Sequence, residues 1–103
     1  MPIVMRRHTQ GGQNVIAAAD TSILGKKYSS GAIVLDLIKF RPFYEGEKTE
    51  VAGLKSALAS CDSANLAGKL SVGAAIEAKL ASKSSIIEIG GVPHLQIYRM
   101  AKQ

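Results

Sequence analysis

The sequence is poor in several residue types, and each shortage excludes a class of protein. It has no tryptophan and a single cysteine, Cys61. One thiol cannot form an internal disulfide, and no group of cysteines and histidines has the spacing of a zinc site, so we expect neither a metal nor another cofactor. No apolar run approaches the roughly 20 residues that cross a bilayer. The start, Met1–His8, lacks the apolar stretch and cleavage site of a secretion signal. We therefore expect a reducing cytoplasm and no membrane contact.

The length predicts one domain covering residues 1–103. A chain of this size buries about two thirds of its unfolded surface, which is enough for one hydrophobic core. Apolar residues make up 47% and charged residues 20%, as in ordinary globular proteins. Because aromatic residues are few, we expect alanine and small aliphatic residues to fill most of the core.

Positive charge exceeds negative charge, and the excess lies mainly in the first part of the chain. The net charge is +5; residues 1–41 hold six Lys/Arg against two Asp, whereas residues 42–61 carry a net −1 and residues 62–103 a net +2. An excess of this size favours loose association with polyanions through their phosphates. The alternative is a surface that only keeps the protein in solution.

The pattern of apolar and turn residues predicts an α+β fold. We expect an N-terminal hairpin, a buried central strand, two helices and a C-terminal hairpin, with an antiparallel or mixed sheet packed against the helices. A short helical turn should follow the first hairpin, with Asp20 accepting its free N–H groups and Gly25 ending it. The expected strands are 3–8, 14–20, 32–38, 86–89 and 94–100, the expected helices are 51–61 and 64–80, and the segment 39–46 is expected to be a surface loop.

The expected second helix contains polar residues in an unexpected place. Asn65, Lys69, Gly73 and Glu77 recur every four residues within the apolar arc of residues 64–80. One interpretation is a polar stripe at the mouth of a groove, where Gly73 allows close approach of a ligand. The alternative is that Lys69 and Glu77 reach around the edge of the core while Asn65 bonds backbone groups.

The string Gly90-Gly91-Val92-Pro93-His94 is a second candidate site. Consecutive glycines allow backbone N–H groups to converge on an anion, and His94 could add charge or move a proton. The alternative is a tight turn between two strands, with the proline fixing φ. No second catalytic group accompanies His94 in the sequence, so we nominate no catalytic residue and expect a binding protein more than an enzyme.

Basic residues of the first 41 positions form a third candidate site. Cations neutralise phosphates, and neighbouring aromatic residues such as Phe40, Phe43 and Tyr44 offer faces for stacking on unpaired bases. The alternative is that these aromatics anchor their loop to the core. The candidate RNA-binding residues are Arg6, Arg7, Lys26, Lys27, Lys39 and Arg41.

Three segments together resemble a known family. They are Ala18-Ala19-Asp20 leading to Leu24-Gly25-Lys26-Lys27, then Ala64-Asn65-Leu66-Ala67-Gly68, and then the Gly90–His94 string. Their order and spacing resemble the archaeal domain-of-unknown-function family 424, over nearly the whole chain. The resemblance implies a small α/β protein of archaeal type with an association with translation, and it brings no catalytic assignment. The positions that fit the family pattern are Gly25, Asn65, Gly68, Gly90, Gly91, Pro93 and His94, whereas the loop at 39–48 and Lys69 depart from it.

Three functions follow as expectations. The first is a translation-associated protein that binds ribosomal RNA or a ribosomal protein through the basic residues, without DNA specificity. The second is a small-molecule or anion-binding protein whose site joins Asn65 and Lys69 to Gly90, Gly91 and His94; it requires Asn65 and His94 to share one concave pocket. The third is a protein–protein interaction module that uses an exposed Phe40–Tyr44 segment.

Overall fold

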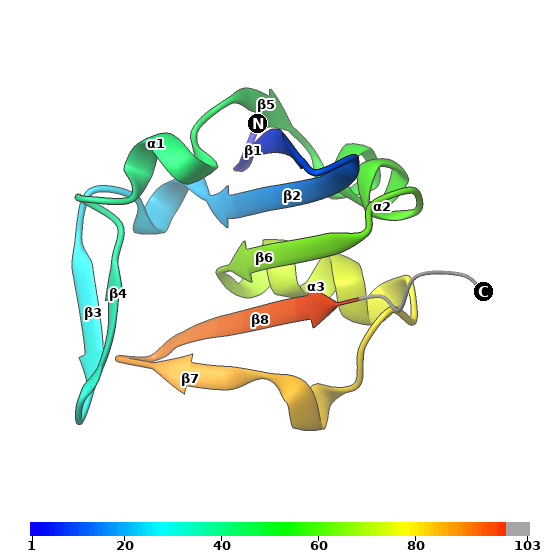
Figure 1. The fold of residues 1–103 in the computed structure, drawn as a ribbon. Helices are drawn as coiled ribbons and strands as arrows, with labels where there is room; N and C mark the ends of the chain where they lie inside the picture. Colours follow the sequence, from blue (N-terminus) through cyan, green and yellow to red (C-terminus); the bar gives the residue numbers. More distant parts are fainter. Residues whose placement is uncertain (99–103) are drawn as a thin grey trace.

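The computed structural model describes residues 1–98, which form a mixed six-stranded sheet, a small two-stranded sheet and three helices (Figure 1). The strand order of the large sheet is β5-β1-β2-β6-β8-β7, in which only the β2–β6 pair is parallel. This arrangement confirms the predicted α+β fold with a mixed sheet. The elements are β1 Ile3–Gln10, β2 Gln13–Asp20, η1 Thr21–Ile23, β3 Lys27–Ser30, β4 Ile33–Asp36, α1 Arg41–Tyr44, β5 Glu47–Thr49, α2 Val51–Leu58, β6 Ser63–Ala67, α3 Lys69–Glu77, η2 Lys83–Ser85, β7 Ile87–Ile89 and β8 Val92–Tyr98.

Both predicted hairpins are present. In the first, Gln10 pairs with Gln13, and Gly11 and Gly12 adopt φ values of +56° and +80°, which suits a two-residue turn between antiparallel strands. In the second, Gly90 and Gly91 make the equivalent turn between β7 and β8. The predicted last strand, 94–100, corresponds to β8, which the structure describes from Val92 to Tyr98; the last two predicted positions lie outside the described residues.

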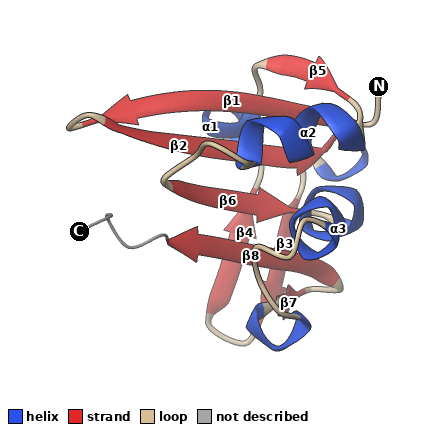
Figure 2. Ribbon diagram, turned by 90° about the vertical axis from the view of Figure 1, so that its right-hand side faces the viewer, coloured by secondary structure: helices blue, strands red, loops and turns tan. Residues whose placement is uncertain are grey.

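The large sheet is packed on both faces. One face carries Ile16, Leu66 and Leu95 against α2 and α3, which lie side by side in Figure 2. The other face carries Ala17 and Ala67 among a second group of buried residues that includes Leu37 of the β4–α1 connection. Because a doubly covered sheet needs small side chains where layers approach closely, β2 has three consecutive, fully buried alanines at 17–19. The expectation that alanine and small aliphatic residues fill most of the core is confirmed.

The predicted position of the central strand is wrong. Residues 33–36 instead form β4, which pairs only with β3 in the small sheet, and the side chains of Ile33 and Val34 are 50% and 57% exposed. A central strand is provided by β6, which covers the start of the segment 64–80 that was predicted to be helical. Short apolar runs do not distinguish a buried strand from a helix by periodicity, and the alanines of Ala64–Ala67 favour helix in isolation. Only α3, from Lys69, is helical, and Gly68, at φ +103°, separates the two elements.

The segment 39–46 is not entirely a loop, because it contains the short helix α1. Pro42 lies in its first turn, where a missing N–H costs nothing. The strands β3 and β5 were not predicted. They are three or four residues long and mostly exposed, so they leave little apolar alternation to detect.

The predicted role of Asp20 is also wrong. The short turn η1 exists, but the Asp20 side chain does not cap it. Its carboxylate is buried and accepts hydrogen bonds from the backbone N–H of Leu70 (2.9 Å), the backbone N–H of Ser71 (2.9 Å) and the Ser71 hydroxyl (2.8 Å). The end of β2 therefore holds the first turn of α3, which follows the neighbouring strand β6. A negative charge is favourable at this end of a helix.

Within residues 1–98, no helix is both long enough and apolar enough to cross a membrane.

Candidate functional site

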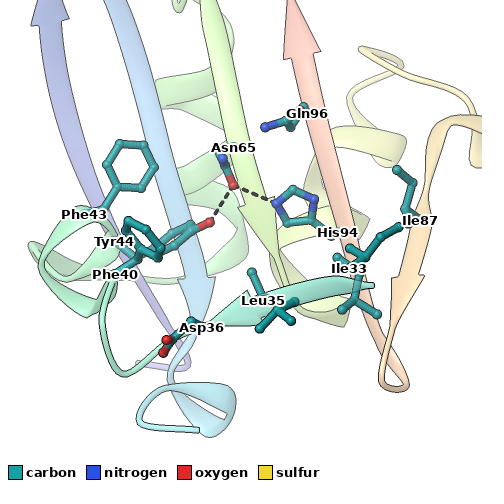
Figure 3. A pocket seen from close by; sticks show the side chains of 12 residues that line it. Ile33, Leu35, Asp36, Phe40, Phe43, Tyr44, Asn65, Ile87, His94 and Gln96 are labelled. Atoms are coloured by element: carbon teal, nitrogen blue, oxygen red, sulfur yellow. Dashed lines mark hydrogen bonds between the residues drawn. The ribbon is translucent and has the colours of Figure 1, made fainter. Parts of the chain in front are cut away.

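A pocket of about 500 Å³ lies on the sheet face opposite α2 and α3 (Figure 3). Strands β6 and β8 form its floor, and β4, α1 and β7 form its walls. Proteins use cavities of this size to bind small organic molecules. The lining residues are Ile33, Val34, Leu35, Asp36, Phe40, Phe43, Tyr44, Asn65, Ile87, Ile89, His94 and Gln96.

The floor of the pocket holds a hydrogen-bonded group of three side chains. Asn65 Oδ1 accepts a hydrogen bond from the Tyr44 hydroxyl at 2.6 Å and lies 2.9 Å from His94 Nε2 (Figure 3). An amide oxygen carries no hydrogen, so Nε2 of His94 is the donor and its Nδ1 is left as an acceptor. Asn65 Oδ1 is thereby fully occupied, and the amide NH₂ of Asn65 remains a donor.

The unused polar atoms of this group are open to a ligand. Among residues 1–98, neither Asn65 Nδ2 nor His94 Nδ1 has a hydrogen-bond partner, and no fully buried side-chain nitrogen or oxygen of this part of the chain lacks one. The two atoms are therefore accessible. Gln96 lies beside this group, because Gln96 of β8 is the partner of Asn65 of β6 in the strand register.

Burial keeps the group uncharged at neutral pH. Desolvation lowers the pKa of His94, which favours the neutral imidazole. Desolvation also raises the pKa of Tyr44 to about 12, so the phenol keeps its proton. The floor of the pocket therefore presents hydrogen-bonding groups without formal charge.

The rim of the pocket is apolar and exposed. Four large apolar side chains line the pocket and yet are at least half exposed. Removing their apolar surface from water would be favourable. They are Ile33, Val34, Phe40 and Ile87, and the term "apolar rim" refers to these four residues.

Asp36 contributes the charged group of the lining. Its Oδ1 accepts hydrogen bonds from the backbone N–H groups of Lys39 (2.9 Å) and Ile38 (3.0 Å), and its Oδ2 lies 3.9 Å from Lys27 Nζ. The hydrogen bond from Lys39 is the largest cause that lowers the pKa of this carboxyl. The carboxylate is thus ionised and already compensated by its own neighbours.

The structure brings only part of the predicted small-molecule site together. Asn65 and His94 share the pocket, although Asn65 lies on a strand rather than on the predicted helix. Lys69 begins α3 and lines a separate groove with Gly73 and Glu77. The four positions Asn65, Lys69, Gly73 and Glu77 therefore do not form a single helical stripe.

Gly90, the first of the two consecutive glycines, packs against the small sheet. The backbone N–H of Gly90 donates to Ser30 Oγ at 2.8 Å, so it is not free to meet an anion. A Cβ on Gly90 would lie 2.8 Å from the backbone nitrogen of Ser29, so a glycine is needed where this turn contacts β3. This contact holds the β3–β4 pair, and with it one wall of the pocket, against the end of the large sheet (Figure 1).

The predicted basic residues are partly gathered. Arg6 donates to the Pro42 carbonyl of α1 at 2.9 Å, and Arg7 points to the opposite face of the sheet, as strand alternation requires. Arg41 forms a two-fold hydrogen bond with Glu45 at 3.1 and 3.2 Å. It also approaches Gly25, whose added Cβ would lie 3.4 Å from Arg41 Nη1. Arg6, Lys26, Lys27, Lys39 and Arg41 thus belong to adjoining segments around α1, and two of them, Lys27 and Arg41, are paired with carboxylates.

The aromatic residues near α1 take three different positions. Phe40 is 51% exposed and lies 5.4 Å below Lys39 Nζ, Phe43 stacks on His8 with ring centroids 4.6 Å apart, and Tyr44 is buried. Of the three aromatic residues that a protein–protein interaction module was expected to expose, only Phe40 is thus exposed. Tyr44 was not predicted to line a pocket, and its position 21 residues before Asn65 gave no local signal. A signal did exist at Asn65, which is a polar residue inside an apolar run.

The fold and this pocket define a class: a small α+β protein whose mixed sheet is packed on both faces and carries, on one face, a pocket with a neutral polar floor. The model of a family described as "Protein of unknown function (DUF424)" matches residues 8–100, and the chain belongs to this family. It is also similar to the crystal structure of an uncharacterized conserved protein from Methanopyrus kandleri, an archaeon, with 26% identity and a TM-score of 0.74, covering 98% of this chain and 96% of that one. The comparison with curated proteins gave no match. The family predicted from the three sequence segments is therefore confirmed.

Proposed function

We propose that this protein binds a small organic molecule in the pocket between α1, β4 and the large sheet. The observation that carries the proposal is the Tyr44–Asn65–His94 group at the floor of a cavity of about 500 Å³. Ligand sites are mostly apolar cavities with a few convergent polar groups that orient the ligand. This pocket has that composition, with one oriented donor at Asn65 and one oriented acceptor at His94.

A purely structural hydrogen-bond network would be expected to lie under a closed layer of side chains. Here the network is open to the cavity, and the apolar rim remains half exposed around it. A ligand that covers the rim would remove this apolar surface from water, which is the main favourable contribution to binding of this kind. We propose binding rather than catalysis, because among residues 1–98 no nucleophile or second proton-transferring group is hydrogen-bonded to His94 Nδ1.

The proposal is tested by screening a diverse fragment library against the full chain with two-dimensional ¹H–¹⁵N NMR. Bound fragments should shift the resonances of the pocket residues, including the side-chain NH₂ of Asn65. The variant Asn65→Ala should weaken these fragments, whereas the matched variant Gly73→Ala, in the separate groove, should not. A library that shifts no pocket resonance, or fragments that bind Asn65→Ala as tightly as the natural chain, would contradict the proposal.

A second candidate function is binding to ribosomal RNA or a ribosomal protein in the cytoplasm. It is supported by the location of five basic residues around α1 and the start of β3, and by the exposed Phe40 beneath the Lys39 ammonium. Arg6, Lys26 and Lys39 have no carboxylate within ion-pair distance among residues 1–98, so they could meet phosphates. Pairing of Lys27 and Arg41 reduces the local positive charge, which is why this function is the second candidate.

Two double variants of equal charge test this second function. If the basic residues around α1 bind RNA, then changing Lys26 and Lys39 to alanine should weaken binding to ribosomal RNA and reduce its salt dependence. Changing Lys69 and Lys83, which line the separate groove, removes the same charge and should have a smaller effect. Co-sedimentation with ribosomes at low salt provides a second measurement. Equal effects of the two double variants, or no association at low salt, would exclude this role.

A further inference from the structure

We infer that the occupant of the pocket is an uncharged amphipathic molecule, with a neutral amide-like head group against Asn65 and His94 and an apolar body against the rim. This inference rests on the proposed function, because it specifies the ligand of the same pocket. It depends on which atoms of the floor are free, on the charges of the lining and on the position of the rim.

The free atoms of the floor include both a donor and an acceptor. The Tyr44 hydroxyl and His94 Nε2 occupy Asn65 Oδ1, and this orients the Asn65 amide so that its NH₂ is the group left to donate. His94 Nδ1 accepts. A ligand amide has both a carbonyl oxygen and an N–H, so it can satisfy both atoms. An ether could accept from the Asn65 NH₂ but would leave His94 Nδ1 without a donor, and a hydrocarbon would leave both atoms unpaired.

The lining holds no cation that could meet an acidic head group. None of its twelve residues is Lys or Arg, and the imidazole of His94 already donates its N–H to Asn65. A carboxylate on the floor would lose its water without gaining an opposite charge, and such burial is far more costly than burial of a neutral amide.

A basic head group is equally poorly matched. The carboxylate of the lining is Asp36, which comes from β4 in the wall and not from the floor. Two backbone N–H groups and the Lys27 ammonium already compensate it. An ammonium on the floor would therefore compete with Lys27 for a carboxylate that is already satisfied, so we expect both signs of charge to be rejected.

The apolar part of the ligand has a defined location. The rim residues Ile33 and Val34 come from β4, Phe40 precedes α1, and Ile87 comes from β7 directly beside His94 in the register. In Figure 3, Ile33 and Ile87 lie on the same side of the floor as His94, and the aromatic residues lie on the other side. A molecule whose head group reaches the floor would place its body between these two walls.

Three probes with the same phenyl ring and three-carbon chain test the inference: 3-phenylpropanamide, 3-phenylpropanoate and 3-phenylpropylammonium. Their dissociation constants for the full chain are measured by NMR titration at pH 7.5, following the pocket resonances and the Asn65 side-chain NH₂. We expect the amide to bind at least about tenfold more tightly than either charged probe, since an unpaired buried charge readily costs that factor.

The variant Asn65→Asp provides a matched change of charge on the floor. Its carboxylate can still accept from Tyr44 and His94, so the shape of the pocket is retained while its NH₂ donor is lost. We expect the amide to weaken and the ammonium probe to gain at least about threefold relative to it. Should this variant fail to fold, the comparison of the three probes on the natural chain still decides the question.

The outcomes separate the inference from the proposed function. If the carboxylate or the ammonium binds as tightly as the amide and shifts the pocket resonances, the neutral-ligand inference is overturned and the pocket remains a binding site. If none of the three probes shifts a pocket resonance, the inference is likewise overturned, and the proposed function then depends on the fragment library alone. Preference for the amide at the pocket resonances supports both.

Discussion

The contact between Asp20 and α3 allows a quantitative prediction, because one buried carboxylate accepts three hydrogen bonds there. Asp20 is 6% exposed and Ser71 is fully buried, so water does not readily replace lost partners. The substitution Asp20→Ala would leave two backbone N–H groups of α3 and the Ser71 hydroxyl without an acceptor. Asp20→Asn keeps one oxygen for Ser71 but turns an NH₂ towards the Leu70 N–H.

The expected losses follow from the number of bonds removed. A hydrogen bond to a charged group contributes about 1.5–3 kcal/mol, and a buried donor left without a partner costs about 1–3 kcal/mol. Asp20→Asn loses one such bond, so it should destabilise the fold by about 2 kcal/mol. Asp20→Ala loses all three, but contributions at one site are not additive, and we expect about 4 kcal/mol.

The measurement is equilibrium unfolding in urea, followed by circular dichroism, for the natural chain and both variants. Glu88→Gln serves as the control, because Glu88 is exposed on β7 and should change stability by less than about 0.5 kcal/mol. The midpoint should fall in the order control, Asn variant, Ala variant, at an unchanged dependence on urea. A loss below about 1 kcal/mol for Asp20→Ala would refute the assignment of this carboxylate as the anchor of α3.

Three further predictions concern the start of α3 and the floor of the pocket on the opposite face of the sheet. Gly68→Ala should destabilise the fold by about 2 kcal/mol or more, because the residue has φ +103° and an added Cβ would collide with the Asp20 carboxylate. Gly73→Ala should instead stabilise the fold by about 0.5–1 kcal/mol, because Gly73 lies within α3 with open space around it. Urea unfolding of both variants checks these two values. Tyr44→Phe removes one of two bonds to Asn65 and should cost about 0.5–1.5 kcal/mol in the same assay; no loss would mean that the 2.6 Å bond contributes nothing net. Because burial lowers the pKa of His94, the unfolded chain takes up the proton before the folded one does as pH falls. The free energy of unfolding of the natural chain should therefore be unaffected by His94 above about pH 6.5 and should decrease as the pH falls below that value. The His94→Gln variant lacks this titrating group, so the natural chain should lose stability relative to it below about pH 6.5. If the free energies of unfolding of the natural chain and of His94→Gln changed equally with pH, this prediction would be contradicted.

The sequence by itself determined those parts of the fold that depend on neighbouring residues. Gly11-Gly12 and Gly90-Gly91 specify tight turns because glycine adopts positive φ at low cost, and the alternation around them identifies both hairpins. The amphipathic spacing that begins at Val51 identifies α2. The same local reasoning assigned Ala64–Ala67 to a helix, because it has no information about what will cover the segment.

The tertiary structure decided the pairing of β6 with β2 and β8, and with it the position of Asn65. Tyr44 and His94 meet Asn65 from 21 and 29 residues away in the chain, and Asp20 reaches α3 across 50 residues. Such contacts depend on which strands become neighbours, a choice made by burial of the whole core and not by the residues on either side. For this reason Asn65 and His94 could be nominated from the sequence, whereas their partner Tyr44, the apolar rim and the separation of Lys69 from them could not.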